Sequence, residues 1–92
     1  MTSLAARAHV TGRVQGVAFR AWTQRRARGL GLSGWVRNEA DGSVTALIAG
    51  DKAKVDEMIA ALHEGPALAR VTAVRTEPVQ VESLLPDFQI TG

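Results

Sequence analysis

The sequence predicts an α+β protein with the ferredoxin-like split βαβ sandwich, in which two helices cover one face of an antiparallel sheet. Segments of alternating apolar and polar residues, typical of strands, and segments with helical spacing follow one another in the order βαββαβ. Glycine-containing turns separate them. A chain of 92 residues, 46% of them hydrophobic, is enough for one modest core, so we interpret residues 1–92 as a single domain.

The first two elements are a strand and a helix. Residues 4–14 alternate between an apolar face and a polar face, which predicts a half-buried strand. The apolar face consists of Leu4, Ala6, Ala8, Val10 and Val14. Residue 20 to about residue 30 form the predicted first helix, and Gly29 and Gly31 mark its end.

The remaining elements are a hairpin, a helix and one or two further strands. The strands "SGWVRN" and "SVTALIAG" flank "EADG", where Asp41 is explained by turn formation. Asp51 is the expected side-chain cap of the second helix, which Gly65 and Pro66 end. A fourth strand is predicted over residues 69–76, and residues 88–90 are expected to add an edge strand after a loop containing Pro86.

The start of the first helix lacks the usual capping residue. In "GRVQGVAFRAW", Val17, Ala18 and Phe19 offer no side-chain acceptor to the unpaired amides, and Arg20 lies where the helix dipole disfavours a cation. Gly16 permits the positive φ that turns consecutive amides into a concave anion site. We therefore expect a bound phosphoryl group, which matches the planar guanidinium. Alternatively, water satisfies the amides and a carboxylate pairs with Arg20.

Asn38 is predicted to lie beside this helix start. In the split βαβ topology the first and second strands run in the same direction, so their C-terminal ends lie at one edge of the domain. Asn38 ends the second strand and shares the side-chain direction of Val36, the expected core residue. Arg20 and Asn38 should therefore meet. Trp35 is expected on the opposite face, where packing under the C-terminal segment explains it better than a ligand role.

The stretches "GRVQGVAFR" and "TQRRARGLGLSGWVRNEADGSV" closely resemble the acylphosphatase family. The family pattern is a glycine, V-Q-G-V, a phenylalanine-arginine pair, L-G-L, G-W-V-x-N and a D-G turn. Every part is present, and the resemblance spans essentially the whole chain. It implies the same sandwich fold and hydrolysis of an acyl phosphate to a carboxylate and inorganic phosphate, with no metal or organic cofactor. The end, "FQITG", departs from members that finish with an aromatic or basic residue, which bears on stability or the rim of the site.

The resemblance also assigns roles to residues. It implies that Arg20 and Asn38 are catalytic, with Asn38 orienting the attacking water, and that the backbone amides of the loop bind the phosphate. The amides are those of Gln15, Gly16, Val17, Ala18, Phe19 and Arg20. The loop has no general acid, and a carboxylate whose conjugate acid has a pKa of about 4 leaves without one. The loop and Asn38 contact only the phosphoryl group and the water, so no residue is predicted to read the acyl group.

Other function classes are excluded or disfavoured. The absence of cysteine excludes disulfides, thiolate metal sites and cysteine nucleophiles. His9 and His63 are isolated and are interpreted as structural or exposed. The N-terminus has no signal-peptide pattern and no apolar run approaches a membrane span, so we expect a cytoplasmic protein with no membrane partner. With a net charge of +2, the arginines at 25, 26 and 28 are explained by a solvated helix face.

Two alternative functions remain at this stage. Single-stranded RNA readers share the order of elements, but the first and third strands here have no aromatic residue and Trp35 alone is no stacking platform, so no nucleic-acid partner is expected. The other alternative is a carbamoyl-phosphate-binding or channelling module of a larger assembly, which would have the same loop. We expect a monomer that acts on a small-molecule acyl phosphate.

Overall fold

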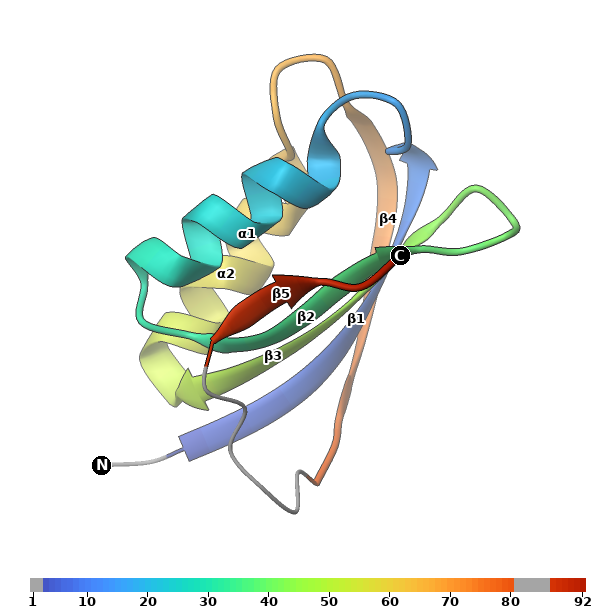
Figure 1. The fold of residues 1–92 in the computed structure, drawn as a ribbon. Helices are drawn as coiled ribbons and strands as arrows, with labels where there is room; N and C mark the ends of the chain where they lie inside the picture. The colour runs from blue at the N-terminus through green and yellow to red at the C-terminus, as the bar shows by residue number, and fades with distance from the viewer. Residues whose placement is uncertain (1–2, 81–86) are drawn as a thin grey trace.

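The computed structural model describes residues 3–80 and 87–92, which form a sheet of five strands with two helices on one of its faces (Figure 1). The elements are β1 (Ser3–Arg13), α1 (Phe19–Gly29), β2 (Ser33–Asn38), β3 (Val44–Asp51), α2 (Lys52–Glu64), β4 (Arg70–Pro78) and β5 (Phe88–Ile90). The predicted order of elements and the α+β sandwich are confirmed. The predicted loop residue Pro86 lies outside the described residues. No helix in the described part of the chain is long and apolar enough to cross a membrane.

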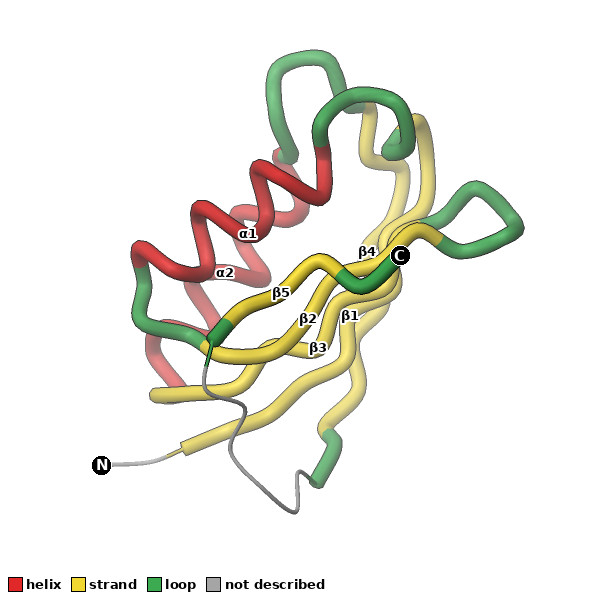
Figure 2. The backbone as a smooth tube through the Cα atoms, viewed as in Figure 1, coloured by secondary structure: helices red, strands yellow, loops and turns green. Residues whose placement is uncertain are grey.

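The strands lie in the order β4-β1-β3-β2-β5. The first four pair antiparallel as predicted, whereas β5 pairs parallel with β2, so the sheet is mixed (Figure 2). The reason is the direction of β4, which ends at the end of the sheet where β2 begins. β5 begins at this same end of the sheet, on the free edge of β2, and therefore runs in the same direction as β2. The edge strand predicted at residues 88–90 is confirmed.

The core lies between the sheet and the two helices. The alternation predicted for the first strand is confirmed, since Ala6, Ala8 and Val10 are buried and Arg7 is exposed. The largest fully buried side chains of the core are Phe19, Phe88, Ile48, Met58, Leu62, Val10, Val14, Val36, Val44 and Val55. Phe19 and Val14 flank the loop between β1 and α1, so the core holds both ends of this loop.

The start of α2 differs in one respect from the prediction. Asp51 occupies the N-cap position with an extended backbone, but its side chain makes no capping hydrogen bond, so the predicted side-chain cap is wrong. Asp51 is also the last residue of β3, paired with Ser3 of β1. In the strand alternation it shares the side of Thr45, away from the helices, so its carboxylate is directed away from the first turn of α2. The predicted end of this helix at Gly65 is confirmed.

Candidate active site

The loop of residues 14–18 leaves the C-terminal end of β1 and enters α1. Gly16 and Ala18 both have a positive φ, 75° and 63°. Ala18 occupies the N-cap position of α1 without a side-chain capping hydrogen bond, so the predicted absence of a cap is confirmed. Among the described residues, no protein acceptor is found for the amides from Gly16 to Ala21. The helix start therefore presents unpaired donors.

The side chain of Gln15 fixes this loop to the turn between β2 and β3. Its Nε2 donates to the main-chain oxygens of Glu39 and Ser43, both at 2.8 Å. Hydrogen bonds within the turn also stabilise it. Oδ1 of Asp41 accepts from the amide of Ser43 at 2.9 Å and from the hydroxyl of Ser43 at 2.5 Å. These two hydrogen bonds from Ser43 lower the pKa of Asp41, and they confirm its turn role. The sequence prediction assigned Gln15 a backbone role only.

Arg20 lies in the first turn of α1 and is half-buried. Its Nη1 donates to the main-chain oxygen of Gly92, which also accepts from the backbone amide of Asn38 at 3.1 Å. Within the described residues no aspartate or glutamate side chain pairs with Arg20, so the predicted alternative, in which a carboxylate pairs with Arg20, is not observed for these side chains. Residue 92 makes its contact with Arg20 through a main-chain oxygen. The contact therefore does not depend on the side chains by which the end of this chain departs from the family pattern.

Asn38 and Arg20 line the same cavity, as predicted. The cavity has a volume of about 230 Å³ and is lined by Val14, Gly16, Ala18, Phe19, Arg20, Ala21, Asn38 and Ile90. Oδ1 of Asn38 is buried and has no hydrogen-bond partner among the described residues. A buried carbonyl oxygen without a donor costs about 1–3 kcal/mol, so Asn38 carries an unsatisfied acceptor beside this cavity.

The predicted site residues divide into two groups. Gly16, Ala18, Phe19, Arg20 and Asn38 line the cavity. Val17 is buried and Gln15 is directed to the β2–β3 turn, so neither side chain lines it. Val14, Ala21 and Ile90 also line the cavity and were not predicted as site residues. Only the pairing of β5 with β2 brings Ile90 there, and no local sequence signal reports this pairing.

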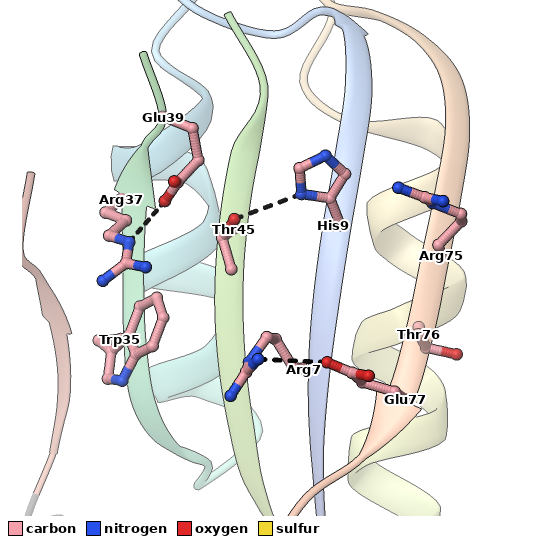
Figure 3. Close-up of a pocket in the computed structure, with 9 residues that line it drawn as sticks. All are labelled: Arg7, His9, Trp35, Arg37, Glu39, Thr45, Arg75, Thr76 and Glu77. Carbon is pink, nitrogen blue, oxygen red and sulfur yellow. Dashed lines mark hydrogen bonds and ion pairs between the residues drawn. The ribbon is translucent and has the colours of Figure 1, made fainter. Parts of the chain in front are cut away.

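The uncovered face of the sheet carries a larger cavity, of about 790 Å³ (Figure 3). Its charges are largely paired with one another: Arg7 with Glu77 at 3.2 Å and Arg37 with Glu39 at 2.5 Å. Trp35 lies on this face as predicted, and the guanidinium carbon of Arg37 is 4.6 Å from its ring centre. The ion pairs neutralise two of the three arginines of this cavity, so Arg75 is the one outside an ion pair among the described residues, and no uncapped helix start adds backbone amides to it.

His9 also lies on the uncovered face. Its Nδ1 is 3.4 Å from the hydroxyl of Thr45, and it is not among the residues that line the smaller cavity (Figure 3). This position agrees with the sequence interpretation of His9 as a structural or exposed residue. It takes no part in the candidate site.

The chain is similar to acylphosphatases over nearly its whole length. The family model described as acylphosphatase matches residues 6–90. A relative from Rhizobium etli, named acylphosphatase, is 56% identical over 96% of this chain and 94% of its own length. A relative of the same name from Mesorhizobium japonicum is 54% identical over the same shares of the two chains.

Solved structures give the same result for the fold. The acylphosphatase from Bacillus subtilis has a TM-score of 0.92 and 33% identity, and the match covers 97% of this chain and 99% of that one. The acylphosphatase from Coxiella burnetii has the same TM-score and 34% identity, with 97% and 93% covered. A solved HypF from T. kodakarensis has a TM-score of 0.86 and 27% identity, and the match covers 97% of this chain but only 12% of that protein.

Proposed function

Because this chain belongs to the acylphosphatase family and is an acylphosphatase, an enzyme that hydrolyses acyl phosphates, we propose that the cavity between α1 and β2 is its active site. One observation carries the proposal. Asn38, whose Oδ1 is buried and unpartnered among the described residues, lines the same cavity as Arg20 and the uncapped start of α1. Donors for an anion and an acceptor for a water molecule therefore lie together.

In this proposal the phosphoryl group replaces the missing cap of α1. The amides of residues 15–20 donate to its oxygens, and the dipole of α1 favours its negative charge. Arg20 uses one of its nitrogens to contact Gly92, and the guanidinium has other N–H groups left to donate to the phosphoryl oxygens. The contact with Gly92 orients the guanidinium before substrate binds, so the donors are preorganised.

Asn38 is proposed to orient the attacking water. Its Oδ1 accepts a hydrogen bond from the water, but the amide cannot act as a base near neutral pH. The water oxygen forms the new bond to phosphorus while the bond from phosphorus to the acyl oxygen breaks. The carboxylate leaves without an acid because its conjugate acid has a pKa of about 4. The proton of the water passes to a phosphoryl oxygen of the substrate.

Steady-state kinetics on acetyl phosphate, with inorganic phosphate as a competitive inhibitor, test these roles. Arg20→Ala should lower kcat by about 10³-fold or more and weaken inhibition by phosphate. Arg20→Lys should also lower kcat, because the point charge of an ammonium group does not replace the planar guanidinium and its N–H donors. Asn38→Ala should keep the inhibition constant of phosphate and lose about 10²–10³ in kcat.

The control for these variants is Arg25→Ala, which removes an exposed cation from the same helix outside the cavity. It should leave both constants unchanged. A rate close to that of the wild type in Arg20→Ala or Asn38→Ala would remove that residue from the mechanism.

We propose that the protein acts as an independent enzyme and not as a carbamoyl-phosphate-binding module of a larger assembly. The relatives that match at about half identity have nearly the length of this chain and are named acylphosphatase. A monomeric state, a cytoplasmic location and the absence of nucleic-acid or membrane partners stay predictions from the sequence.

A further inference from the structure

Ile90 is an exposed apolar side chain at the candidate active site. It is the last residue of β5 and is 40% exposed, and among the described residues the other exposed large hydrophobic is Leu68. Ile90 lines the cavity with Arg20 and Asn38, whereas Leu68 is not part of that lining. The pairing of Ile90 with Val36 places it beside the strand that ends at Asn38. An isoleucine that stays half-exposed beside two polar site residues is available for contact with a ligand.

The other cavity walls leave few groups to contact an acyl chain. Arg20 is the only charged residue and Asn38 the only side-chain amide among the described lining residues. In the proposed mechanism both are engaged, Arg20 with the phosphoryl oxygens and Asn38 with the water. An acyl group is therefore left with apolar neighbours, of which Ile90 and Ala18 are exposed.

The geometry of in-line displacement directs the acyl group outward. The attacking water and the leaving group lie on opposite sides of phosphorus. Oδ1 of Asn38 is fully buried, so the water is held at the inner side of the cavity and the leaving group points to its mouth. Ile90, which is 40% exposed, belongs to the mouth rather than to the buried wall.

We propose that Ile90 contacts the acyl group and makes the enzyme prefer acyl phosphates with an apolar acyl group over those whose acyl group carries a second charge. This inference rests on the proposed active site. It assigns the reading of the acyl group to β5, an element that contributes nothing to phosphoryl binding. The preferred substrates are alkanoyl and aroyl phosphates.

The test compares kcat/KM for acetyl, butyryl, benzoyl and succinyl phosphate. Each buried methylene changes binding by about fourfold, so Ile90→Ala should lower the benzoyl-to-acetyl ratio about threefold to tenfold, through KM. Inhibition by inorganic phosphate, which has no acyl group, should not change. Ile90→Lys should raise the succinyl-to-benzoyl ratio, which a merely destabilised protein would not do. The matched control is Gln89→Ala, on the same strand but on the other face of the sheet.

The outcomes separate this inference from the proposal beneath it. If Arg20→Ala and Asn38→Ala keep the rate of the wild type on all four acyl phosphates, the proposed active site fails. If those two variants lose turnover but the ratios are the same in Ile90→Ala and Ile90→Lys as in the wild type, the role of Ile90 is overturned and the active site stands. A change of the ratios in Gln89→Ala equal to that in Ile90→Ala would also overturn it, because the effect would then belong to β5 as a whole.

Discussion

Replacing Gln15 should lower both the stability of the protein and its turnover. The side chain of Gln15 joins the loop before α1 to the turn that follows Asn38, by two hydrogen bonds of 2.8 Å. These bonds set the distance between the loop amides and the side chain of Asn38. Gln15→Ala removes both of them, whereas Gln15→Glu keeps the shape but turns a carboxylate toward two main-chain oxygens.

The expected loss of stability follows from the partners that remain. A neutral hydrogen bond contributes about 0.5–1.5 kcal/mol, so two bonds correspond to about 1–3 kcal/mol. The oxygen of Ser43 still accepts from the amide of Glu39 at 2.8 Å, and the oxygen of Glu39 still accepts from the amide of Gly42 at 3.2 Å. Neither acceptor is left without a donor, so Gln15→Ala should cost about 1–2 kcal/mol of unfolding free energy.

The loss of turnover should be larger than the loss of stability suggests. A displacement of about 1 Å between groups that hold the substrate and the water can cost about 10²-fold. We therefore expect Gln15→Ala to lower kcat by about 10-fold to 100-fold on acetyl phosphate. Gln15→Glu should be worse than Gln15→Ala at neutral pH, because the two carbonyl oxygens disfavour the charged carboxylate.

Urea unfolding and steady-state kinetics measure the two effects, with Gln89→Ala as the control because Gln89 is exposed on β5. The stability deficit of Gln15→Glu should also shrink as the pH falls toward about 4.3, the ordinary pKa of glutamate, and should be smallest below it, where the side chain is protonated in both states. A variant Gln15→Ala that loses about 1–2 kcal/mol of stability but keeps the kcat of the wild type would refute the positioning role. The bond would then be purely structural.

Two further predictions concern backbone strain and pH. Ala18 holds a left-handed φ of 63°, which costs about 1–2 kcal/mol. Ala18→Gly should therefore stabilise the fold by about 0.5–1 kcal/mol, after the entropy of the glycine in the unfolded chain is subtracted. Urea unfolding measures this change, and a loss of stability would show that the backbone at residue 18 is not left-handed. The pKa of Asp87 lies below its ordinary value of 3.8, because the amide of Phe88 and then Arg28 stabilise the carboxylate. The contribution of Asp87 to stability is therefore present above pH 3.8 and is lost as the pH falls below that value. The difference in Tm between the wild type and Asp87→Asn should narrow in acid. A difference in Tm that stays constant with pH would contradict this.

The fold was predictable because its signals are local. The alternation over residues 4–14, the end of the second helix at Gly65 and the turn at Asp41 each report the element in which they occur. The meeting of Arg20 and Asn38 followed from topology, since strands that run in the same direction end at one edge. The side-chain cap by Asp51 was predicted wrongly because the last pair of β3 also determines which way that side chain points.

The missed contributions of Ile90 and Gly92 depend on β5, whose pairing no local pattern reveals. β5 has only three residues, yet its parallel pairing with β2 brings Ile90 to the cavity and is followed by the contact of Gly92 with Arg20. The anchor of β5 is equally non-local, because Arg28 of α1 holds Asp87 with two hydrogen bonds, at 3.0 and 2.7 Å. The loop proposed to bind phosphate is thus encoded in one continuous stretch, whereas the group that contacts its arginine and the residue proposed to meet the acyl chain come from the last residues of the given sequence.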